Sequence, residues 1–158
     1  MSNNNFNIVE FNIARIHDSL DKELISELLS ENDRINKLAD FAPGFVWRYQ
    51  NAGIDGLGPR IFSDQNIILT FSVWKSIESL FEFVYTGSHL EIMRKRKQWF
   101  GLLENYMVLW WSPADHIPNT DEAKERLKYL QTHGATPKAF TFDKRFSAPE
   151  SYDYSLFI

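Results

Sequence analysis

His89 and Arg96 are the side chains whose sequence context most directly suggests chemistry. The run Ser88-His89-Leu90-Glu91 has the S-x-x-E form of a capping box, which predicts that His89 lies in the first turn of a helix. The helix dipole favours a neutral imidazole there, which can act as a base or a hydrogen-bond donor. Arg96 follows on the same predicted helical face, where it could hold a carboxylate, phenolate or enolate. Alternatively, His89 only bonds its loop, and Arg96 belongs to a solvated basic run, Arg94–Lys97.

Two predicted strands also carry polar side chains on one face. Glu10 and Asn12 alternate along one strand, and Ser72 and Trp74 alternate along another. If the two faces line one cavity, they supply an aromatic wall, a carboxylate and an amide. We then expect Glu10 to act as a general base, with the other three side chains binding the substrate. Glu10 could equally lie at the surface or at a dimer interface.

Two further tryptophans, Trp47 and Trp110, are candidates for stacking against a flat substrate. Both lie in apolar stretches, so plain packing is the alternative. Aromatic residues make up 15% of the chain, which suits a pocket for a flat ligand as well as an aromatic-rich core.

Composition and spacing argue against several classes of site. The chain has 158 residues and no cysteine, which excludes disulfides and thiolate metal sites. Its formal net charge of −4 argues against a nucleic-acid partner. The histidines show no H-x-x-x-H spacing and no glycine-rich phosphate loop precedes a helix, so we expect no metal and no cofactor.

The length suits one domain, which we place at residues 6–146, with a flexible N-terminus at 1–5 and a C-terminal tail at 147–158. The polar N-terminus does not have the pattern of a signal peptide. No apolar run approaches the roughly 20 residues that cross a bilayer. These features predict a cytoplasmic protein with no membrane partner.

The elements that must position these side chains alternate between strand and helix patterns. The pattern predicts strands at 8–16, 45–50, 66–74 and 107–111 and a last edge strand at 138–142. Helices are predicted after the first strand, after the third strand and from residue 120, and 51–65 is predicted as a loop. In the second strand, Phe45, Trp47 and Tyr49 should share one side. The order predicts a ferredoxin-like α+β fold, an antiparallel sheet with helices on one face. The other face needs a cover, so we expect a homodimer that packs sheet against sheet. A pocket could then lie inside this barrel or between sheet and helices.

Several motifs in a fixed order carry a resemblance to a known family. They are Phe11–Arg15 (FNIAR), Pro43–Arg48 (PGFVWR), Ser72–Leu80 (SVWKSIESL), Val108–Trp111 (VLWW), Pro113–Pro118 (PADHIP) and His133–Phe142 (HGATPKAFTF). Together they resemble the bacterial family called domain of unknown function 3291, over residues 6–146. The resemblance implies a dimeric α+β barrel related to the antibiotic-biosynthesis monooxygenases. The haem-degrading branch of that superfamily has a Trp and a His where this chain has Phe83 and Met93.

The resemblance also implies a class of function. It points to a small-molecule enzyme of the cofactor-independent monooxygenase, cyclase or isomerase type. The substrate would be flat and apolar or phenolic, and the reaction would use His-assisted proton transfer. The alternatives are a non-catalytic small-molecule binder, with haem as one candidate ligand, or a structural homodimer.

Overall fold

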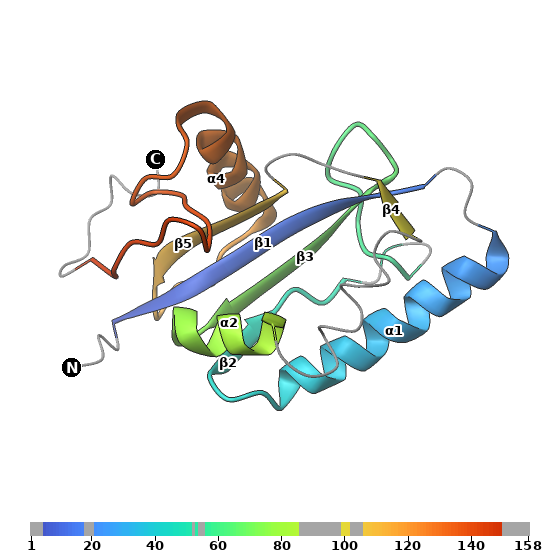
Figure 1. Ribbon diagram of the computed structural model, residues 1–158, viewed down its shortest axis with the longest axis horizontal. Coiled ribbons are helices and arrows are strands. Elements are labelled where there is room, and N and C mark those ends of the chain that lie inside the picture. Colours follow the sequence, from blue (N-terminus) through green and yellow to red (C-terminus); the bar gives the residue numbers. More distant parts are fainter. Residues whose placement is uncertain are drawn as a thin grey trace.

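The protein folds around one antiparallel sheet, with helices on both faces (Figure 1). The structure is a computed structural model that describes residues 5–17, 21–51, 53, 56–85, 99–101 and 106–149. The strands are β1 (Phe6–Ile16), β2 (Phe45–Arg48), β3 (Ile67–Trp74), β4 (Phe100–Gly101) and β5 (Met107–Pro113), and the helices are α1 (Lys22–Asp40), α2 (Ile77–Tyr85) and α4 (Thr120–His133). No helix within the described ranges is long and apolar enough to cross a membrane.

β1 is the central strand of the sheet. The strand order is β2-β3-β1, and both β4 and β5 pair with the other edge of β1. Every one of these pairings is antiparallel. Glu10 has Ser72 as its neighbour on β3 and Leu109 as its neighbour on β5, so the middle of β1 is bonded on both edges. This architecture confirms the predicted ferredoxin-like α+β fold, but α4 lies on the sheet face that was predicted to carry no helix.

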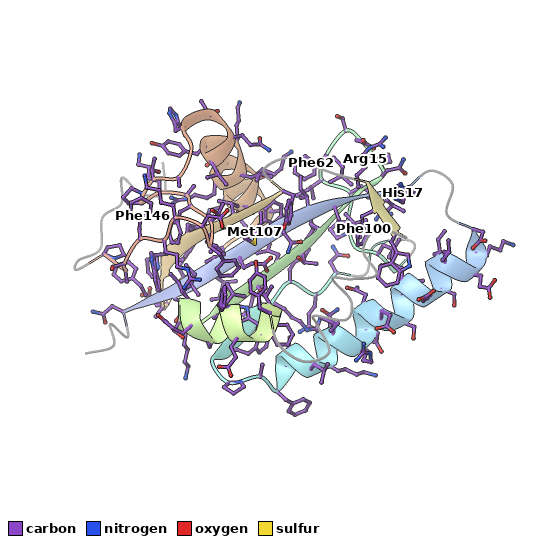
Figure 2. All side chains as sticks on the ribbon, viewed as in Figure 1. Arg15, His17, Phe62, Phe100, Met107 and Phe146 are labelled. Carbon is purple, nitrogen blue, oxygen red and sulfur yellow. The ribbon has the colours of Figure 1, made fainter. Side chains whose placement is uncertain are left out.

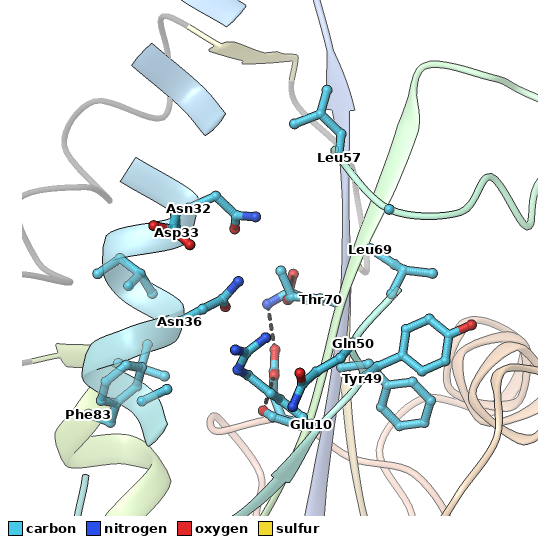
Figure 3. A pocket seen from close by; sticks show the side chains of 18 of the residues that line it. Glu10, Asn32, Asp33, Asn36, Tyr49, Gln50, Leu57, Leu69, Thr70 and Phe83 are labelled. Atoms are coloured by element: carbon cyan, nitrogen blue, oxygen red, sulfur yellow. Dashed lines mark hydrogen bonds between the residues drawn. The ribbon is translucent and has the colours of Figure 1, made fainter. Parts of the chain in front are cut away.

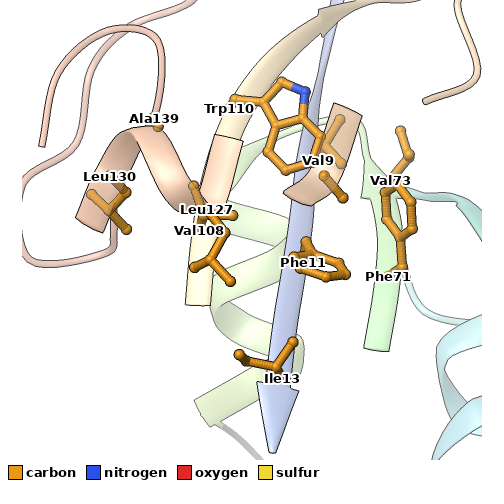
Figure 4. Packing of buried hydrophobic residues seen from close by; sticks show 11 residues of the cluster. Val9, Phe11, Ile13, Phe71, Val73, Val108, Trp110, Leu127, Leu130 and Ala139 are labelled. Atoms are coloured by element: carbon orange, nitrogen blue, oxygen red, sulfur yellow. The ribbon is translucent and has the colours of Figure 1, made fainter. Parts of the chain in front are cut away.

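The two faces of the sheet pack against different helices. Even positions of β1 face α1 and α2, and Ile8 packs in one apolar cluster with Ala39 of α1 and Leu80 of α2. Odd positions face α4, and Phe11 packs in a second cluster with Leu127 of that helix (Figure 4). β1 therefore separates two hydrophobic cores, one on each side of the sheet.

α4 covers the sheet face that the sequence analysis assigns to a second copy of the chain. Val9, Phe11 and Trp110 lie on this face, and each is 0% exposed within a single chain. Their burial therefore needs no partner sheet, because apolar side chains of the same chain already surround them. The homodimer stays a prediction that a single chain does not test.

A glycine fixes the turn between α1 and β2. Gly44 has a φ of +81°, in the left-handed region that favours glycine. A Cβ at this position would lie 2.4 Å from Ser79 Oγ and 2.6 Å from Ser79 Cβ. The carbonyl of Gly44 accepts from the amide of Lys75 at 2.8 Å, and Ser76 Oγ accepts from the amide of Ser79 at 3.1 Å. The turn thus holds the start of β2 against the first turn of α2.

Arg15, near the far end of β1, anchors the long loop between β2 and β3. Figure 2 shows Arg15 beside His17 and Phe100 at this end of the sheet. Arg15 Nε donates to Asp64 Oδ2 at 2.8 Å, and this bond holds the pKa of the Asp64 carboxyl below its usual value. Leu57, in the same loop, is buried in an apolar cluster that also contains residues of β1 and α1. The loop therefore packs against the sheet at two points.

Candidate functional site

A cavity of about 480 Å³ lies between α1 and the even-numbered face of the sheet. β1 and β3 form its floor, α1 forms one wall, and α2 and the loop at 56–59 contribute the ends. Figure 3 shows Asn32 and Asn36 of α1 across the cavity from Glu10 and Thr70 of the sheet. Of the two locations that the sequence leaves open, this pocket occupies the one between sheet and helices.

Glu10 lies on the floor of this pocket and is only 6% exposed. Its Oε1 accepts from Asn12 Nδ2 at 2.5 Å, and its Oε2 accepts from Ser72 Oγ at 3.0 Å. A carboxylate accepts hydrogen bonds and cannot donate them, so this arrangement suits a charged Glu10. Each carboxylate oxygen is held by its own donor, which fixes the orientation of the group.

Each of these two hydrogen bonds is the last link of a longer hydrogen-bond chain. In the first chain, Trp74 Nε1 donates to Ser72 Oγ at 2.9 Å. An indole N–H only donates, so the hydroxyl proton of Ser72 is directed to Glu10. In the second chain, Thr70 Oγ1 donates to Asn12 Oδ1 at 2.5 Å, and the amide of Asn12 then donates to Glu10. The structure thus brings together four residues that the sequence analysis places in one site: Glu10, Asn12, Ser72 and Trp74.

The α2 end of the pocket is apolar. The indole of Trp74 is 1% exposed and packs against two phenylalanines, with centroid distances of 5.4 Å to Phe45 and 5.1 Å to Phe83. Leu80 and Val84 of α2 line the same end. The pocket therefore has an apolar end next to a polar floor, which suits a ligand with one apolar and one polar part.

Arg48 lines the pocket because β2 contains a β-bulge. The register shifts between Phe45 and Trp47, so Phe45 packs on the pocket face and Trp47 on the α4 face. The prediction that both lie on one side is wrong, since one extra residue reverses the alternation. Arg48 consequently faces the pocket, where Nε and Nη2 donate to Asp40 at 2.8 Å and 3.3 Å. This pair joins β2 to the last residue of α1.

Trp47 and Trp110 do not line this pocket. Trp47 packs edge-on against Phe71 on the α4 side, with 5.4 Å between ring centroids. Trp110 is 0% exposed and donates from Nε1 to Glu122 Oε2 at 3.2 Å. Both tryptophans therefore belong to the α4 core, which matches the packing alternative.

Glu122 ties the loop before α4 to that core. Its second oxygen, Oε1, lies 2.8 Å from His116 Nε2, and its backbone amide donates to Asn119 Oδ1 at 2.9 Å. Asn119 is thus the N-cap of α4, a role that suits its side chain. This cluster lies on the α4 side of the sheet and contributes nothing to the pocket lining.

His89 and Arg96 lie outside the described residues, as does Met93. Their predicted roles therefore stay predictions. Phe83 lines the pocket beside Trp74.

The α1 wall and Gln50 were not predicted from the sequence. Asn32, Asn36 and Gln50 all line the pocket, and each carries an amide. The helical spacing of Asn32 and Asn36, which puts them on one face of α1, was the available signal. Nothing in that spacing shows that this face of α1 lies over Glu10.

Tyr85 is a further ionisable group in the pocket lining. Burial raises the pKa of its phenol, and nearby Tyr106 and Asp143 raise it further. Within the described ranges, no group of three or more His, Cys, Asp or Glu side chains could hold a metal ion. The described lining therefore offers the carboxylates of Glu10 and Asp33, the guanidinium of Arg48, several tyrosine phenols and several neutral polar groups.

The fold and the pocket define a ferredoxin-like α+β protein with a small-molecule-sized cavity under its helices. The chain belongs to the family described as Domain of unknown function (DUF3291), whose model matches residues 7–155. This match confirms the family that the motifs indicate. No curated protein matches the chain significantly.

Solved structures with a similar fold come from several bacteria. SnoaB, a cofactor-independent oxygenase from Streptomyces nogalater, is 14% identical over 70% of this chain and 95% of its own, with a TM-score of 0.47. Rv0793 from Mycobacterium tuberculosis is 10% identical over 71% and 99%, with a TM-score of 0.49. PA3566 from Pseudomonas aeruginosa is 8% identical over 75% and 99%, with a TM-score of 0.48. Similarities at this level assign no activity to the chain.

Proposed function

We propose that this protein is an enzyme that removes a proton from a small, flat, partly apolar molecule bound between α1 and the sheet. Glu10 is the proton acceptor. The observation that carries the proposal is its carboxylate, 6% exposed and held through both oxygens on the floor of a cavity of about 480 Å³. Oxygenation, cyclisation and isomerisation without a cofactor can all start from such a proton transfer, because each can pass through an enolate or phenolate.

The pocket supports this role through orientation and shielding. Asn12 and Ser72 hold the two oxygens of Glu10, and all three residues belong to the paired strands β1 and β3. A base that is held in one orientation, close to a bound substrate, needs little reorganisation during proton transfer. A substrate ring placed against Phe83 and Val84, at the apolar end of the pocket, would bring an acidic O–H or C–H within reach of Glu10.

Arg48 supports the second half of the reaction. Proton removal leaves negative charge on the substrate, and an adjacent cation stabilises that charge. Nε and Nη2 of Arg48 bond Asp40, so Nη1 is the nitrogen that we assign to the developing oxyanion. Asp40 acts as the positioning group for this guanidinium.

His89 and Arg96 enter the proposal from the sequence alone. His89 would act as a second base or hydrogen-bond donor, and Arg96 as a second cation near the substrate oxygen. His89→Gln and Arg96→Gln should each lower the reaction rate if these roles hold. An unchanged rate in both variants would remove them from the mechanism while leaving Glu10 in place.

Deuterium exchange tests the proposal without knowledge of the later steps. The probe is 6-hydroxy-1-tetralone, a flat bicyclic phenol with enolisable hydrogens next to its carbonyl, followed by NMR in heavy water. The wild type should accelerate exchange, and Glu10→Gln should lower the enzymatic rate at least about 100-fold, as expected for loss of a general base. The matched control is Glu78→Gln on the exposed surface of α2, which should exchange at the wild-type rate.

Calorimetric titration of the same compound separates the alternatives. Binding with exchange that depends on Glu10 supports the enzyme. Binding without accelerated exchange would overturn the catalytic role and leave a binding protein. Absence of binding by this compound, by its unsubstituted parent 1-tetralone and by larger tricyclic phenols would overturn the pocket assignment itself.

A further inference from the structure

We infer that this pocket selects ligands that present a hydrogen-bond donor, a phenolic or alcoholic O–H or an N–H, to Thr70. It discriminates against ethers and carboxylates at the same position. The inference rests on the proposed function for the place of the ligand, and it adds the class of ligand that the site accepts.

The direction of the hydrogen bonds around Glu10 carries the inference. The carboxylate of Glu10 only accepts, so the side of the Asn12 amide that faces it must be the NH₂ group. The carbonyl oxygen of Asn12 then faces Thr70, and the hydroxyl of Thr70 must donate to it. A reversed Asn12 amide would place two acceptor oxygens against each other. The single hydroxyl proton of Thr70 is therefore committed to Asn12.

Thr70 Oγ1 consequently presents lone pairs, and no proton, to the pocket. The residue is exposed, lines the cavity, and lies across from Asn36 of α1 (Figure 3). A hydroxyl oxygen that has donated its proton still accepts from a ligand O–H or N–H. An ether oxygen at this position meets another acceptor and forms no bond. A ligand carboxylate meets in addition the negative charge of Glu10.

The other polar groups in the lining do not impose the same choice. Asn32, Asn36 and Gln50 carry amides that can either donate or accept, so each can adapt to either kind of ligand. Arg48 only donates, and it favours ligand acceptors near its own position. Glu10, Ser72 and Asp33 also line the pocket and also accept. Ser72 Oγ already accepts from Trp74 Nε1, Glu10 is 6% exposed, and Asp33 Oδ2 pairs with Lys37. Thr70 is the exposed hydroxyl on the pocket floor whose proton is committed, and we assign it as a specificity-determining residue.

Paired ligands test the assignment. Calorimetric titration near neutral pH compares 6-hydroxy-1-tetralone with its methyl ether, 6-methoxy-1-tetralone, on wild type, Thr70→Ser and Thr70→Val. The wild type should bind the phenol about 3- to 10-fold more tightly, the worth of one hydrogen bond between neutral groups. Thr70→Ser should keep this ratio, because serine keeps the hydroxyl. Thr70→Val, which retains the shape and suits a strand, should bring the ratio close to one.

Thr132→Val is the control, because Thr132 is exposed on α4 and its hydroxyl bonds only the backbone of its own helix in the described contacts. It should show the wild-type ratio. Equal affinity of the wild type for both compounds would overturn the inference while leaving the pocket assignment in place. A preference for the phenol that survives Thr70→Val would also overturn it. Binding of neither compound would instead count against the proposed function. If Thr70→Val does not fold, Thr70→Ala gives the same comparison.

Discussion

Replacing Gly44 by alanine should destabilise the protein strongly, although the change adds one methyl group. The residue has a φ of +81°, and its Cβ would lie 2.4 Å from Ser79 Oγ and 2.6 Å from Ser79 Cβ. Real Cβ atoms do not approach other heavy atoms this closely, so either the turn or the first part of α2 must move.

Two costs add in this variant. An alanine in the left-handed region costs about 1–2 kcal/mol. Forcing a methyl group into an occupied site costs about 1–3 kcal/mol more. The free energy of unfolding should therefore fall by about 2–5 kcal/mol. For a domain of this size, each kcal/mol corresponds to roughly 2–4 °C in Tm, so a loss of several degrees or more is expected.

Urea unfolding of Gly44→Ala, Ser79→Gly and the double variant measures the two costs separately. Ser79→Gly removes the atoms that the new methyl group would meet, so the double variant should be more stable than the sum of the single changes predicts. Gly58→Ala is a useful control, because Gly58 has a φ of +99° and its nearest contact, at 3.5 Å, is ordinary. Strict additivity, or equal losses for Gly44→Ala and Gly58→Ala, would refute the reasoning about the contact with Ser79.

Three further predictions concern stability. Glu122→Ala should lower the free energy of unfolding in urea by about 1–3 kcal/mol, because it leaves the buried Nε1 of Trp110 without its acceptor. Glu122→Gln keeps an acceptor oxygen and should lower it less. Equal losses in the two variants would contradict this. The pKa of Tyr85 in the folded state is raised above 10.0, so above this pH the folded state keeps a proton that the unfolded state loses. The free energy of unfolding should therefore fall as pH rises past 10.0. Tyr85→Phe should flatten this fall, and identical pH profiles for the variant and the wild type would contradict the prediction. Leu127→Ala, at a side chain that is 2% exposed, should cost about 2–5 kcal/mol by thermal or urea unfolding, and a loss below 1 kcal/mol would contradict the packing.

The floor of the pocket could be predicted from the sequence because it depends on local periodicity. Alternation along β1 and β3 puts Glu10 and Asn12 on one face, and Ser72 and Trp74 on another. Antiparallel pairing in the observed register then makes these two faces the same face of the sheet. The first step follows from the extended backbone. The second step does not, because the sequence leaves open whether the two faces line one cavity or whether Glu10 lies at the surface or at a dimer interface, and the register of the two strands decides it.

The rest of the site depends on choices between distant segments. The placement of α4 on the odd-numbered face decides that Trp110 is a core residue, and no local pattern in α4 specifies which sheet face it covers. The bulge in β2 decides that Trp47 faces away from the pocket, and its position depends on how β2 fits against β3. For the same reason, the α1 wall with Asn32 and Asn36 could be recognised as one helical face but not assigned to the pocket.

Because of the bulge, β2 can lose one residue without changing which side chain faces the pocket. Because the register shifts between Phe45 and Trp47, Val46 is the extra residue, and it is 41% exposed. Deleting Val46 would restore regular alternation and still leave Arg48 on the side of Glu10. Deleting Trp47 instead would also leave Arg48 opposite Ser72, but it would put Val46 in the place of the tryptophan on the α4 face. Related chains could therefore differ by one residue at this position and keep the same binding surface, so alignments of the family should tolerate a gap here.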